Sequence, residues 1–264
     1  KIVHVDIDPS EINKVIQTNL GIVADCKLVL EALSSENVTT AHHEEWIHYC
    51  KQNKQKHPFK YDKNEDDTFS KPQKAIEYIG KITNGDAIVT TDVGQHQMWA
   101  AQFYPFKDHG QWVTSGGLGT MGFGIPSAIG AQLASPDKTV VCFVGDGGFQ
   151  MTNQEMALLP EYNLNVKIVL INNGTLGMVK QWQDKFFNQR FSHSVFNDQP
   201  DFIKMAEAYG INGYLIDSSD KLESQIDAAF NHNGPALIEV RISPVEPVNP
   251  MVPSGKSNHE MEGL

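Results

Sequence analysis

The chain has 264 residues, of which 40% are hydrophobic and 20% are charged, and its 32 acidic and 21 basic side chains give a formal net charge of −11. This composition is typical of a globular protein with a sizeable core, and it excludes a disordered or collagen-like chain. Because nucleic-acid binding needs a surplus or a stripe of Lys and Arg, the acidic balance argues against a nucleic-acid partner.

Neither the apolar runs nor the cysteines point to a membrane span or a disulfide framework. The apolar runs, such as 139–144 and 166–171, are far shorter than the roughly 20 residues of a membrane helix. The three cysteines are scattered and lack metal-ligand spacing, so we expect a reducing compartment and a cytoplasmic location. The chain starts at Lys1 and runs directly into an apolar segment, and we interpret it as the C-terminal part of a longer protein.

The first part of the chain has a short α/β pattern followed by a polar segment. After an apolar strand pattern at 2–7, Ser10 is expected to cap a helix that starts with acidic residues. A second apolar stretch at 20–23 and a helix at 27–33 complete the pattern. Residues 34–73 are rich in Lys, His, Asn, Asp and Glu, and we expect one exposed helix and a linker there.

From residue 74 onward, strands and helices alternate regularly. The expected strands are 87–91, 112–114, 139–144, 166–171, 214–216 and 236–240. The expected helices are 74–83, 96–103, 123–134, 153–161, one from about 177, 200–209 and 220–231. Such alternation predicts parallel βαβ units, and near-continuous apolar strands fit a sheet covered on both faces. We therefore expect an α/β fold with a parallel sheet of about six strands and helices on both faces.

Four of the expected strands end in loops that are rich in glycine or in polar residues. These loops are 92–96, 115–122, 145–149 and 172–177. Ligands of open α/β sheets bind beyond the carboxyl ends of the strands, so all four loops lie where a ligand is expected. Because glycines permit close backbone approach and helix N-termini attract anions, the loops predict a phosphate-binding site.

Two readings of these loops differ in the ligand that they imply. Residues 117–122 match the dinucleotide pattern G-x-G-x-x-G, which by itself would indicate an NAD-binding module. Asp146, however, lies between glycines and is followed by Asn173 at the end of the next strand. The ends of adjacent parallel strands lie about 5 Å apart, so this carboxylate and amide oxygen could hold one Mg²⁺ ion. A βα-turn aspartate and an ordinary Asx turn at 172–173 are the structural alternatives.

Gly145-Asp146-Gly147, followed one strand later by Asn172-Asn173, resembles the signature of thiamine diphosphate enzymes. The segments that narrow the resemblance to the catalytic subunit of acetohydroxyacid synthase, also called acetolactate synthase, are 92–99, 116–122 and 177–183. The resemblance runs through nearly all of 86–210 and extends into 250–255.

The resemblance implies a set of cofactor-binding residues. Asp146, Asn173 and the backbone carbonyl of Thr175 are implied to hold Mg²⁺ against the diphosphate. The residues implied to contact thiamine diphosphate are Val93, Gly94, Gln95, His96, Gly119, Met121, Gly145, Asp146, Gly147, Gly148, Asn173, Thr175, Leu176, Gly177 and Met178.

Four of the implied residues lie at the reacting centre: Met121, Gln95, Met178 and Trp182. Met121 is implied to support the thiazolium ring, and Gln95 to lie near the diphosphate and the active centre. Met178, Trp182 and Phe186 are spaced i, i+4 and i+8, which by pattern alone indicates a core stripe on a helix. The resemblance instead implies that Met178 and Trp182 face the active-site cavity, where Trp182 favours 2-oxobutanoate over pyruvate.

The first segment resembles the end of the middle domain of the same family. The residues that match FAD contacts in that domain are Asp6, Ile7, Asp25 and Cys26. The division that we expect is the end of the FAD-contacting domain at 1–34, a linker at 35–73, the thiamine diphosphate and Mg²⁺ domain at 74–249 and a tail at 250–264.

The implied activity is the decarboxylation of pyruvate and its ligation to a second 2-oxo acid, giving 2-acetolactate or 2-aceto-2-hydroxybutanoate for branched-chain amino acid synthesis. The family also implies a homodimer or tetramer with its site at the subunit interface, and a small regulatory subunit. A glutamate from the neighbouring subunit's N-terminal domain activates the cofactor in this family. No segment here resembles that domain, so we expect the isolated chain to be inactive. Another thiamine diphosphate enzyme, such as a pyruvate oxidase or decarboxylase, and an NAD-binding Rossmann module are the alternatives.

Overall fold

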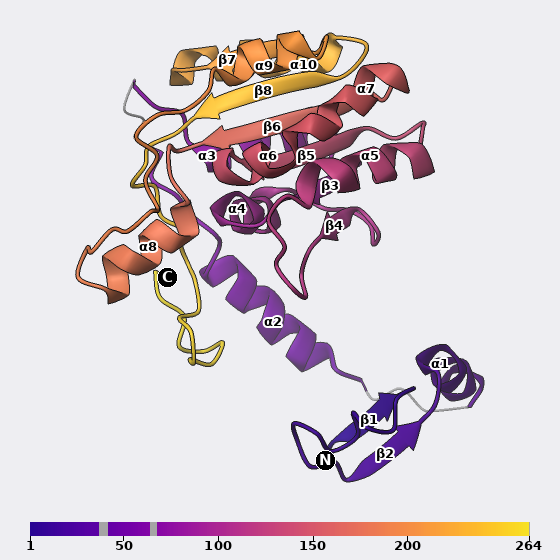
Figure 1. The fold of residues 1–264 in the computed structure, drawn as a ribbon. Coiled ribbons are helices and arrows are strands. Elements are labelled where there is room, and N and C mark those ends of the chain that lie inside the picture. The colour runs from indigo at the N-terminus through magenta and orange to yellow at the C-terminus, as the bar shows by residue number, and fades with distance from the viewer. Residues whose placement is uncertain (37–41, 64–67, 264) are drawn as a thin grey trace. The chain divides into compact units, whose positions relative to one another are not determined.

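Parallel strands form the sheets of both units of the chain (Figure 1). The structure, a computed structural model, describes residues 1–36, 42–63 and 68–263. The chain divides into the units Lys1–Pro58 and Phe59–Leu264. The boundaries that the sequence suggests at residues 34, 73 and 249 stay predictions.

The first unit contains a two-stranded parallel sheet and two helices. Its elements are β1 (Val3–Asp6), β2 (Leu20–Val23), α1 (Cys26–Ser35) and α2 (Glu44–Lys56). Asp25 caps α1, because its carboxylate accepts a hydrogen bond of 2.7 Å from the backbone N–H of Lys27. The exposed helix expected within 34–73 corresponds to α2, which has no buried residue.

The helix that Ser10 was expected to cap is absent, and residues 7–16 form turns and bends instead. The carboxylate of Asp6 accepts the N–H of Asp8, and that of Asp8 accepts the N–H of Ser10, at 2.9 and 2.8 Å. Such side-chain bonds compete with helix formation for the same N–H groups. Asn13 then takes a left-handed backbone conformation, with φ of 65°, which ends any helical run.

A six-stranded parallel sheet forms the centre of the second unit, as the sequence predicts. Its strands in spatial order are β4 (Trp112–Thr114), β3 (Ile88–Thr91), β5 (Val140–Gly145), β6 (Val166–Asn172), β8 (Ala236–Arg241) and β7 (Asn212–Ile216). Both β5 and β6 are buried along their full length, which explains their largely apolar sequences. The exception in β6 is the buried Lys167, whose amino group donates to the carbonyls of His232 and Gly234.

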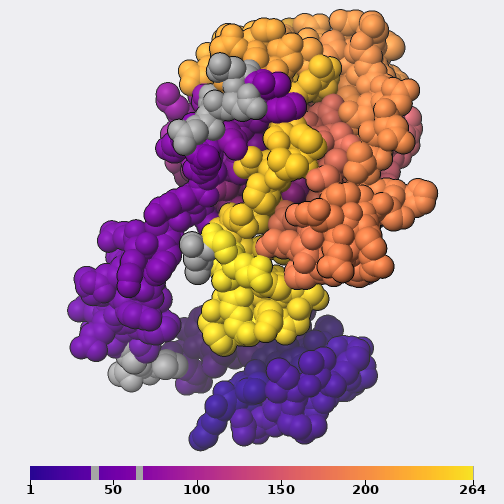
Figure 2. Space-filling model, turned by 90° about the vertical axis from the view of Figure 1, so that its left-hand side faces the viewer, coloured from indigo at the N-terminus to yellow at the C-terminus, as the bar shows by residue number. Residues whose placement is uncertain are grey.

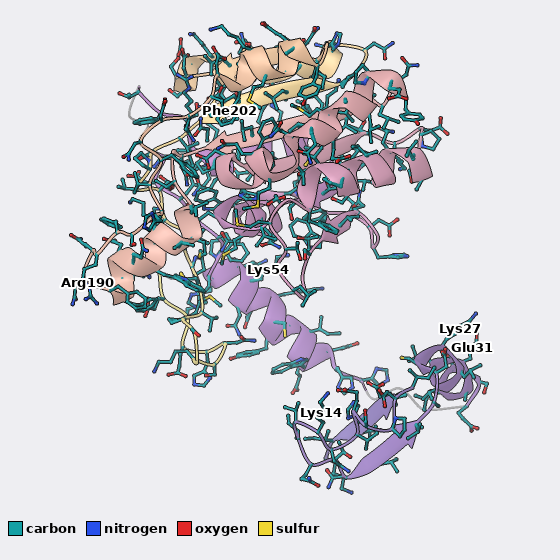
Figure 3. The ribbon with its side chains drawn as sticks, in the orientation of Figure 1. Lys14, Lys27, Glu31, Lys54, Arg190 and Phe202 are labelled. Carbon is teal, nitrogen blue, oxygen red and sulfur yellow. The ribbon has the colours of Figure 1, made fainter. Side chains whose placement is uncertain are left out.

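Helices cover both faces of this sheet and enclose a hydrophobic core on each (Figure 1). One face packs against α3 (Pro72–Ile82), α4 (Gln95–Phe103) and α10 (Leu222–Asn231). The other packs against α5 (Gly124–Ala134), α6 (Asp146–Thr152), α7 (Leu158–Glu161) and α9 (Phe202–Ala208). Figure 3 shows Phe202 of α9 beside the sheet, where its ring meets that of Phe149 edge-on with centroids 5.4 Å apart.

The expected helix at 153–161 is only partly right. Helix α6 begins directly at Asp146, and a 3₁₀ turn at Asn153–Ala157 and the short α7 follow it. Residues 145–149 were expected to form a glycine-rich loop, but the chain is helical from Asp146 onward despite the low helix propensity of glycine. As a result Asp146 stands in the first turn of a helix, directly at the end of β5.

Two further segments complete the second unit. Helix α8 (Gly177–Phe186) follows β6, and the C-terminal segment runs beside it, as Figure 2 shows in orange and yellow. An ion pair of 2.9 Å between Lys185 and Glu262 joins the two. Within the described residues, no helix combines the length and apolarity needed to cross a membrane.

Candidate functional site

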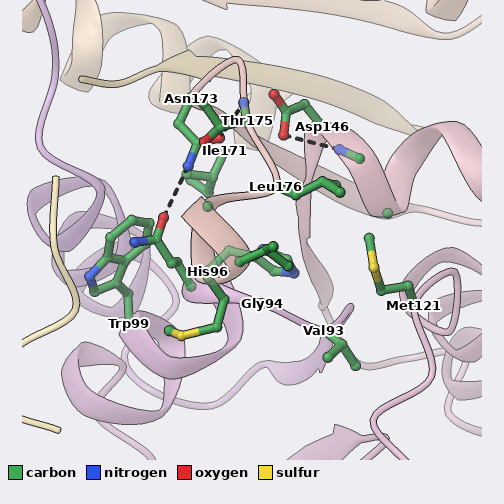
Figure 4. Close-up of a pocket in the computed structure, with 17 residues that line it drawn as sticks. Val93, Gly94, His96, Trp99, Met121, Asp146, Ile171, Asn173, Thr175 and Leu176 are labelled. Carbon is green, nitrogen blue, oxygen red and sulfur yellow. Dashed lines mark hydrogen bonds between the residues drawn. The ribbon is translucent and has the colours of Figure 1, made fainter. Parts of the chain in front are cut away.

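A cavity lies at the carboxyl ends of β3, β5 and β6, at the position where open α/β sheets bind ligands (Figure 4). The residues that line it are Val93, Gly94, Gln95, His96, Trp99, Met121, Gly145, Asp146, Gly147, Gly148, Ile171, Asn173, Thr175, Leu176, Gly177, Met178 and Val179. Asp146, Asn173 and Thr175 lie on one side, and Val93 and Met121 on another, with Leu176 between them (Figure 4).

The cavity gathers every residue expected to contact thiamine diphosphate except Gly119. Three further residues line it that the sequence did not suggest: Trp99, Ile171 and Val179. Trp182 lies outside and lines a separate cavity of about 350 Å³ with Val179, Gln183, Phe187 and Arg190. Of the four residues expected at the reacting centre, Met121, Gln95 and Met178 therefore come together, and Trp182 does not join them.

Asp146 places a buried carboxyl group at the end of β5. One of its oxygens accepts the N–H of Gly147 at 3.0 Å, and the other accepts a bond of 2.7 Å from Nε2 of Gln199. Burial raises the pKa of Asp146 to about 6, although these hydrogen bonds act to lower it. A carboxylate that is buried from solvent and has no cationic partner within the described residues is suited to bind a metal ion.

Asn173 and Thr175 lie in a tight loop at the end of β6, the strand next to β5. Oδ1 of Asn172 accepts the N–H of Gly174 at 3.1 Å, and Oδ1 of Asn173 accepts the N–H of Thr175 at 3.0 Å. The loop thus consists of two successive Asx turns, as the structural alternative proposes. These turns do not exclude metal binding, because the oxygen of Asn173 and the carbonyl of Thr175 retain further lone pairs.

The donor set fits a hard cation. Asp146, Asn173 and Thr175 supply a carboxylate, an amide oxygen and a carbonyl, which are oxygen ligands of the kind that Mg²⁺ prefers. The buried hydroxyl of Thr175 has no hydrogen-bond partner within the described residues. The site therefore contains a polar group that is free to hydrogen-bond to a ligand.

Glycines on the cavity wall are required by close packing. A Cβ atom on Gly145 would lie 2.8 Å from Nδ1 of His96, and one on Gly147 would lie 2.5 Å from Cδ2 of Leu176. A Cβ on Gly148 would collide with the carboxyl group of Asp92. The glycines of the 145–148 loop therefore let the backbone approach its neighbours, as the sequence pattern predicts.

Asp92 is a central residue that the sequence reading missed. It is fully buried, and its carboxyl oxygens accept the N–H groups of Val93, Gly122 and Gly124 at 2.9, 3.1 and 2.9 Å. It therefore ties the loop after β3 to the loop before α5. An aspartate directly after a buried strand was the available signal, but two of its three partners, Gly122 and Gly124, lie 30 and 32 residues away in the sequence.

His96 is buried beside Asp92 and is held in its neutral form. Burial lowers the pKa of His96 to about 4, and the nearby charge of Asp92 only partly opposes this effect. Its Nε2 atom is buried and has no partner within the described residues. The imidazole thus offers the cavity wall an unused polar atom.

Gln199 and Gln181 were also missed as site residues. Gln199 reaches Asp146 from the segment before α9, and no sequence pattern marks it. Gln181 belongs to a segment of the family resemblance, but the resemblance gave it no role. It is buried on α8, accepts hydrogen bonds from the side-chain nitrogen of Gln95 and the N–H of Val248, and donates one to the carbonyl of Val248.

The apolar stripe on α8 is only partly a core stripe. Met178 packs against the core, whereas Trp182 and Phe186 are 45% and 51% exposed. The pattern-based prediction of a core stripe is therefore wrong for its outer part. Figure 3 shows Arg190, which shares the cavity of Trp182, at the outer end of the segment that follows α8.

The residues expected to contact FAD lie at the ends of the two strands of the first unit. Asp6 ends β1, and Asp25 and Cys26 follow β2, its parallel neighbour. Asp6 and Asp25 both accept backbone N–H groups, and Ile7 is 70% exposed. The four residues thus share one edge of a small parallel sheet.

Comparison with known proteins agrees with this geometry. The family described as "Thiamine pyrophosphate enzyme, C-terminal TPP binding domain" matches residues 92–240, more than half of the chain. The chain is 50% identical to the acetolactate synthase large subunit of Lactococcus lactis, covering 100% of this chain and 45% of the relative. It is 42% identical to the acetolactate synthase isozyme 2 large subunit of Escherichia coli, covering 98% of this chain and 46% of the relative. It is 43% identical to acetolactate synthase 1, chloroplastic, of Nicotiana tabacum, covering 97% of this chain and 40% of the relative. The chain spans less than half the length of each of these relatives.

Proposed function

The chain belongs to the thiamine pyrophosphate enzymes through their C-terminal TPP binding domain, and from this premise we propose that it carries the diphosphate and metal half of an acetolactate synthase active site. The observation that carries the proposal is the meeting of Asp146, Asn173 and Thr175 in one cavity at the ends of β5 and β6. Acetolactate synthase large subunits that match nearly the whole chain support the choice within the family.

Asp146, the oxygen of Asn173 and the carbonyl of Thr175 are the residues that would hold Mg²⁺. The carboxylate of Asp146 contributes charge, and the two neutral oxygens fix its position across two adjacent strands. The glycines at 145, 147 and 148 let the backbone of this loop pack closely against His96, Leu176 and Asp92 at the cavity wall. Bound thiamine diphosphate supplies the electron sink that decarboxylation of a 2-oxo acid requires.

The apolar residues of the cavity position the reacting partners and keep water away. Met121 and Leu176 approach each other over Gly147, where a Cβ atom would meet both side chains. Met178 closes the wall on the side of α8. An apolar enclosure of this kind limits the access of water to the reacting atoms.

The proposed substrates are pyruvate and a second 2-oxo acid, either pyruvate or 2-oxobutanoate, and the products are 2-acetolactate and 2-aceto-2-hydroxybutanoate. Trp182 is the proposed discriminating residue. It lies one helical turn beyond Met178 and lines the neighbouring cavity with Val179, which also lines the main cavity.

Other parts of the proposal concern the larger assembly. We propose that Asp6, Ile7, Asp25 and Cys26 contact FAD, and that the working enzyme is a cytoplasmic homodimer or tetramer with a regulatory subunit. The exposed aromatic rings of α8 and the segment after it support a covering partner, because large exposed apolar patches mark interaction sites. These rings are Trp182, Phe186, Phe187 and Phe191.

Calorimetric titration of the chain with thiamine diphosphate, with and without Mg²⁺, and then with NAD tests the proposal. We expect weak binding of thiamine diphosphate that depends on Mg²⁺ and is lost in Asp146→Ala. Binding of NAD with no response to thiamine diphosphate would overturn the proposal in favour of a dinucleotide module.

A product assay of the enzyme that contains the chain tests the choice within the family. We expect acetolactate from pyruvate. Acetaldehyde or an oxidised acetyl product instead would favour the decarboxylase or oxidase alternative.

A further inference from the structure

Three side-chain amides, two of them buried and one partly buried, connect the metal-binding loop to the C-terminal segment. They belong to Asn173 after β6, Gln95 at the start of α4 and Gln181 in the middle of α8. We propose that Gln181 is a positioning residue, which acts through Gln95 to turn the oxygen of Asn173 toward the metal. The inference rests on the proposed function, because it assigns a task to residues around the same metal site.

The orientation of the Gln181 amide is fixed by the peptide backbone. Its Nε2 donates to the carbonyl of Val248 at 3.3 Å, and its Oε1 accepts the N–H of Val248 at 3.0 Å. A backbone N–H only donates and a carbonyl only accepts, so this pair leaves one arrangement of the side-chain oxygen and nitrogen. The Sδ atom of Met251, 3.2 Å from Nε2, is a second acceptor on the same side.

The fixed amide of Gln181 in turn orients the side-chain amide of Gln95. Because Oε1 of Gln181 faces Gln95, the nitrogen of Gln95 must turn toward it, and the N···O distance is 2.8 Å. The same nitrogen also donates to the carbonyl of Glu246 at 3.2 Å. Oε1 of Gln95 is therefore directed away from the C-terminal segment and toward Asn173.

The last step orients Asn173. Its Nδ2 donates to Oε1 of Gln95 at 3.0 Å, a bond drawn in Figure 4, so its Oδ1 points to the other side. That oxygen accepts the N–H of Thr175 and is the proposed metal ligand. If Gln95 were reversed, two amide nitrogens would meet, and Asn173 would relieve the conflict by presenting its NH₂ group to the metal.

Burial makes this chain of bonds effective. Gln95 and Gln181 are 5% and 8% exposed, so water cannot readily replace a lost partner. Gly177 leaves the space that Gln95 and Asn173 occupy, because a Cβ atom there would collide with Oε1 of Gln95 and lie 2.5 Å from Nδ2 of Asn173. An apolar side chain at 181 would fill the same volume but would transmit no orientation.

Substitutions at 181 separate orientation from packing. Gln181→Met keeps the approximate volume and removes both polar atoms, whereas Gln181→Glu keeps the acceptor that Gln95 and Val248 use. Gln132→Met is the matched control, because Gln132 is another buried amide, whose nitrogen donates to the carbonyls of Ser135, Pro136 and Lys138 away from the cavity.

Two measurements on the full chain are needed: titration with Mg²⁺ and thiamine diphosphate, and hydrogen exchange at the N–H groups of Thr175 and Val248 without cofactor. We expect Gln181→Met to raise the Kd by about tenfold or more, as substitutions behind metal ligands commonly do, and to speed exchange at both groups. Gln181→Glu should retain more affinity than Gln181→Met although the buried charge lowers its thermal stability. Gln132→Met should lower stability and leave Kd unchanged.

The results separate this inference from the proposed function. If Gln181→Met binds as the wild type does and exchange at Thr175 is unchanged, the inference is overturned. It is also overturned if affinity follows thermal stability across the variants, because packing alone would then explain it. Failure of the wild-type chain to take up thiamine diphosphate with Mg²⁺ at any concentration would contradict the proposed function, while hydrogen exchange would still test the orientation.

Discussion

Asp146 combines a proposed metal-binding role with a cost in stability. Its pKa is about 6 in the folded chain against a usual 3.8, because burial disfavours the charged form. Between these two pH values the folded chain holds a proton that the unfolded chain has lost, so stability falls as the pH rises through this window. At neutral pH the shift corresponds to roughly 3 kcal/mol.

We therefore expect Asp146→Asn, which removes the buried charge but replaces one of two hydrogen-bond acceptors by an NH₂ group, to raise the free energy of unfolding of the ligand-free chain at pH 7 by about 1 to 2 kcal/mol, and to abolish Mg²⁺-dependent binding of thiamine diphosphate. Urea denaturation and calorimetric titration measure the two effects. A variant that is less stable than the wild type at pH 7 would contradict the burial argument.

His96 has the opposite dependence on pH. Its pKa of about 4 in the folded chain lies below the usual 6.5, because burial disfavours the imidazolium form. The unfolded chain therefore binds more protons between these values, and stability is lost as the pH falls from 6.5 toward 4. Between pH 6.5 and 4, we expect the free energy of unfolding of His96→Gln to fall by about 3 kcal/mol less than that of the wild type. Denaturation at a series of pH values gives the slope, and equal slopes in both proteins would refute the assignment.

Among the side chains near the site, we expect the carboxyl group of Asp92 to contribute most to the free energy of unfolding. In Asp92→Asn an NH₂ group replaces one of the two oxygens that accept the N–H groups of Val93, Gly122 and Gly124. Leaving a buried donor unpaired costs about 1 to 3 kcal/mol, so the free energy of unfolding should fall by that amount. Asp86→Asn, at an exposed aspartate, serves as the control and should change little.

Helix α8 is expected to set substrate preference through its outer face. Trp182 is 45% exposed, so Trp182→Leu should leave stability nearly unchanged. A rigid ring distinguishes substrates that differ by one methylene group, which is typically worth about 1 to 3 kcal/mol. In a competition between pyruvate and 2-oxobutanoate, we expect the enzyme with Trp182→Leu to form acetolactate and to lose the preference. An unchanged product ratio would remove Trp182 from this role.

At the scale of elements, the sequence predicted what depends on local pattern. The central strands were recognisable because they are largely apolar runs, and their order placed Asp146 and Asn173 on adjacent strand ends. The helix expected after Ser10 failed because aspartate side chains took the N–H groups that it needed. The first turn of α6 was missed because its glycines are held in place by packing against Asp92 and Leu176.

The candidate site was predictable only for residues in recognisable motifs. Asp92, Gln181 and Gln199 act through partners that are 30 to 86 positions away, and such pairings leave no periodic trace in a single sequence. Gly119 and Trp182 follow from the family resemblance, but they do not line the main cavity. Motifs therefore identified most of the residues that line the cavity, and the structure supplied the groups that hold them.

At the scale of the whole molecule, we expect the isolated 264-residue chain to form no acetolactate from pyruvate. The family implies a glutamate from an N-terminal domain that no segment of this chain resembles. A colorimetric acetolactate assay with saturating Mg²⁺ and thiamine diphosphate provides the measurement. Formation of acetolactate by the purified chain would contradict this expectation.

The order of strands in the sheet also bears on how the protein folds. The loops that form the cavity follow β3, β5 and β6, which are neighbours in space but are separated in the chain by helices and by the edge strand β4. No contiguous peptide from this protein could reproduce the cavity, because its walls meet only after the central sheet has assembled. A ligand bound there would act as a non-covalent cross-link between three distant segments, and it would stabilise the sheet against unfolding in proportion to the logarithm of its concentration.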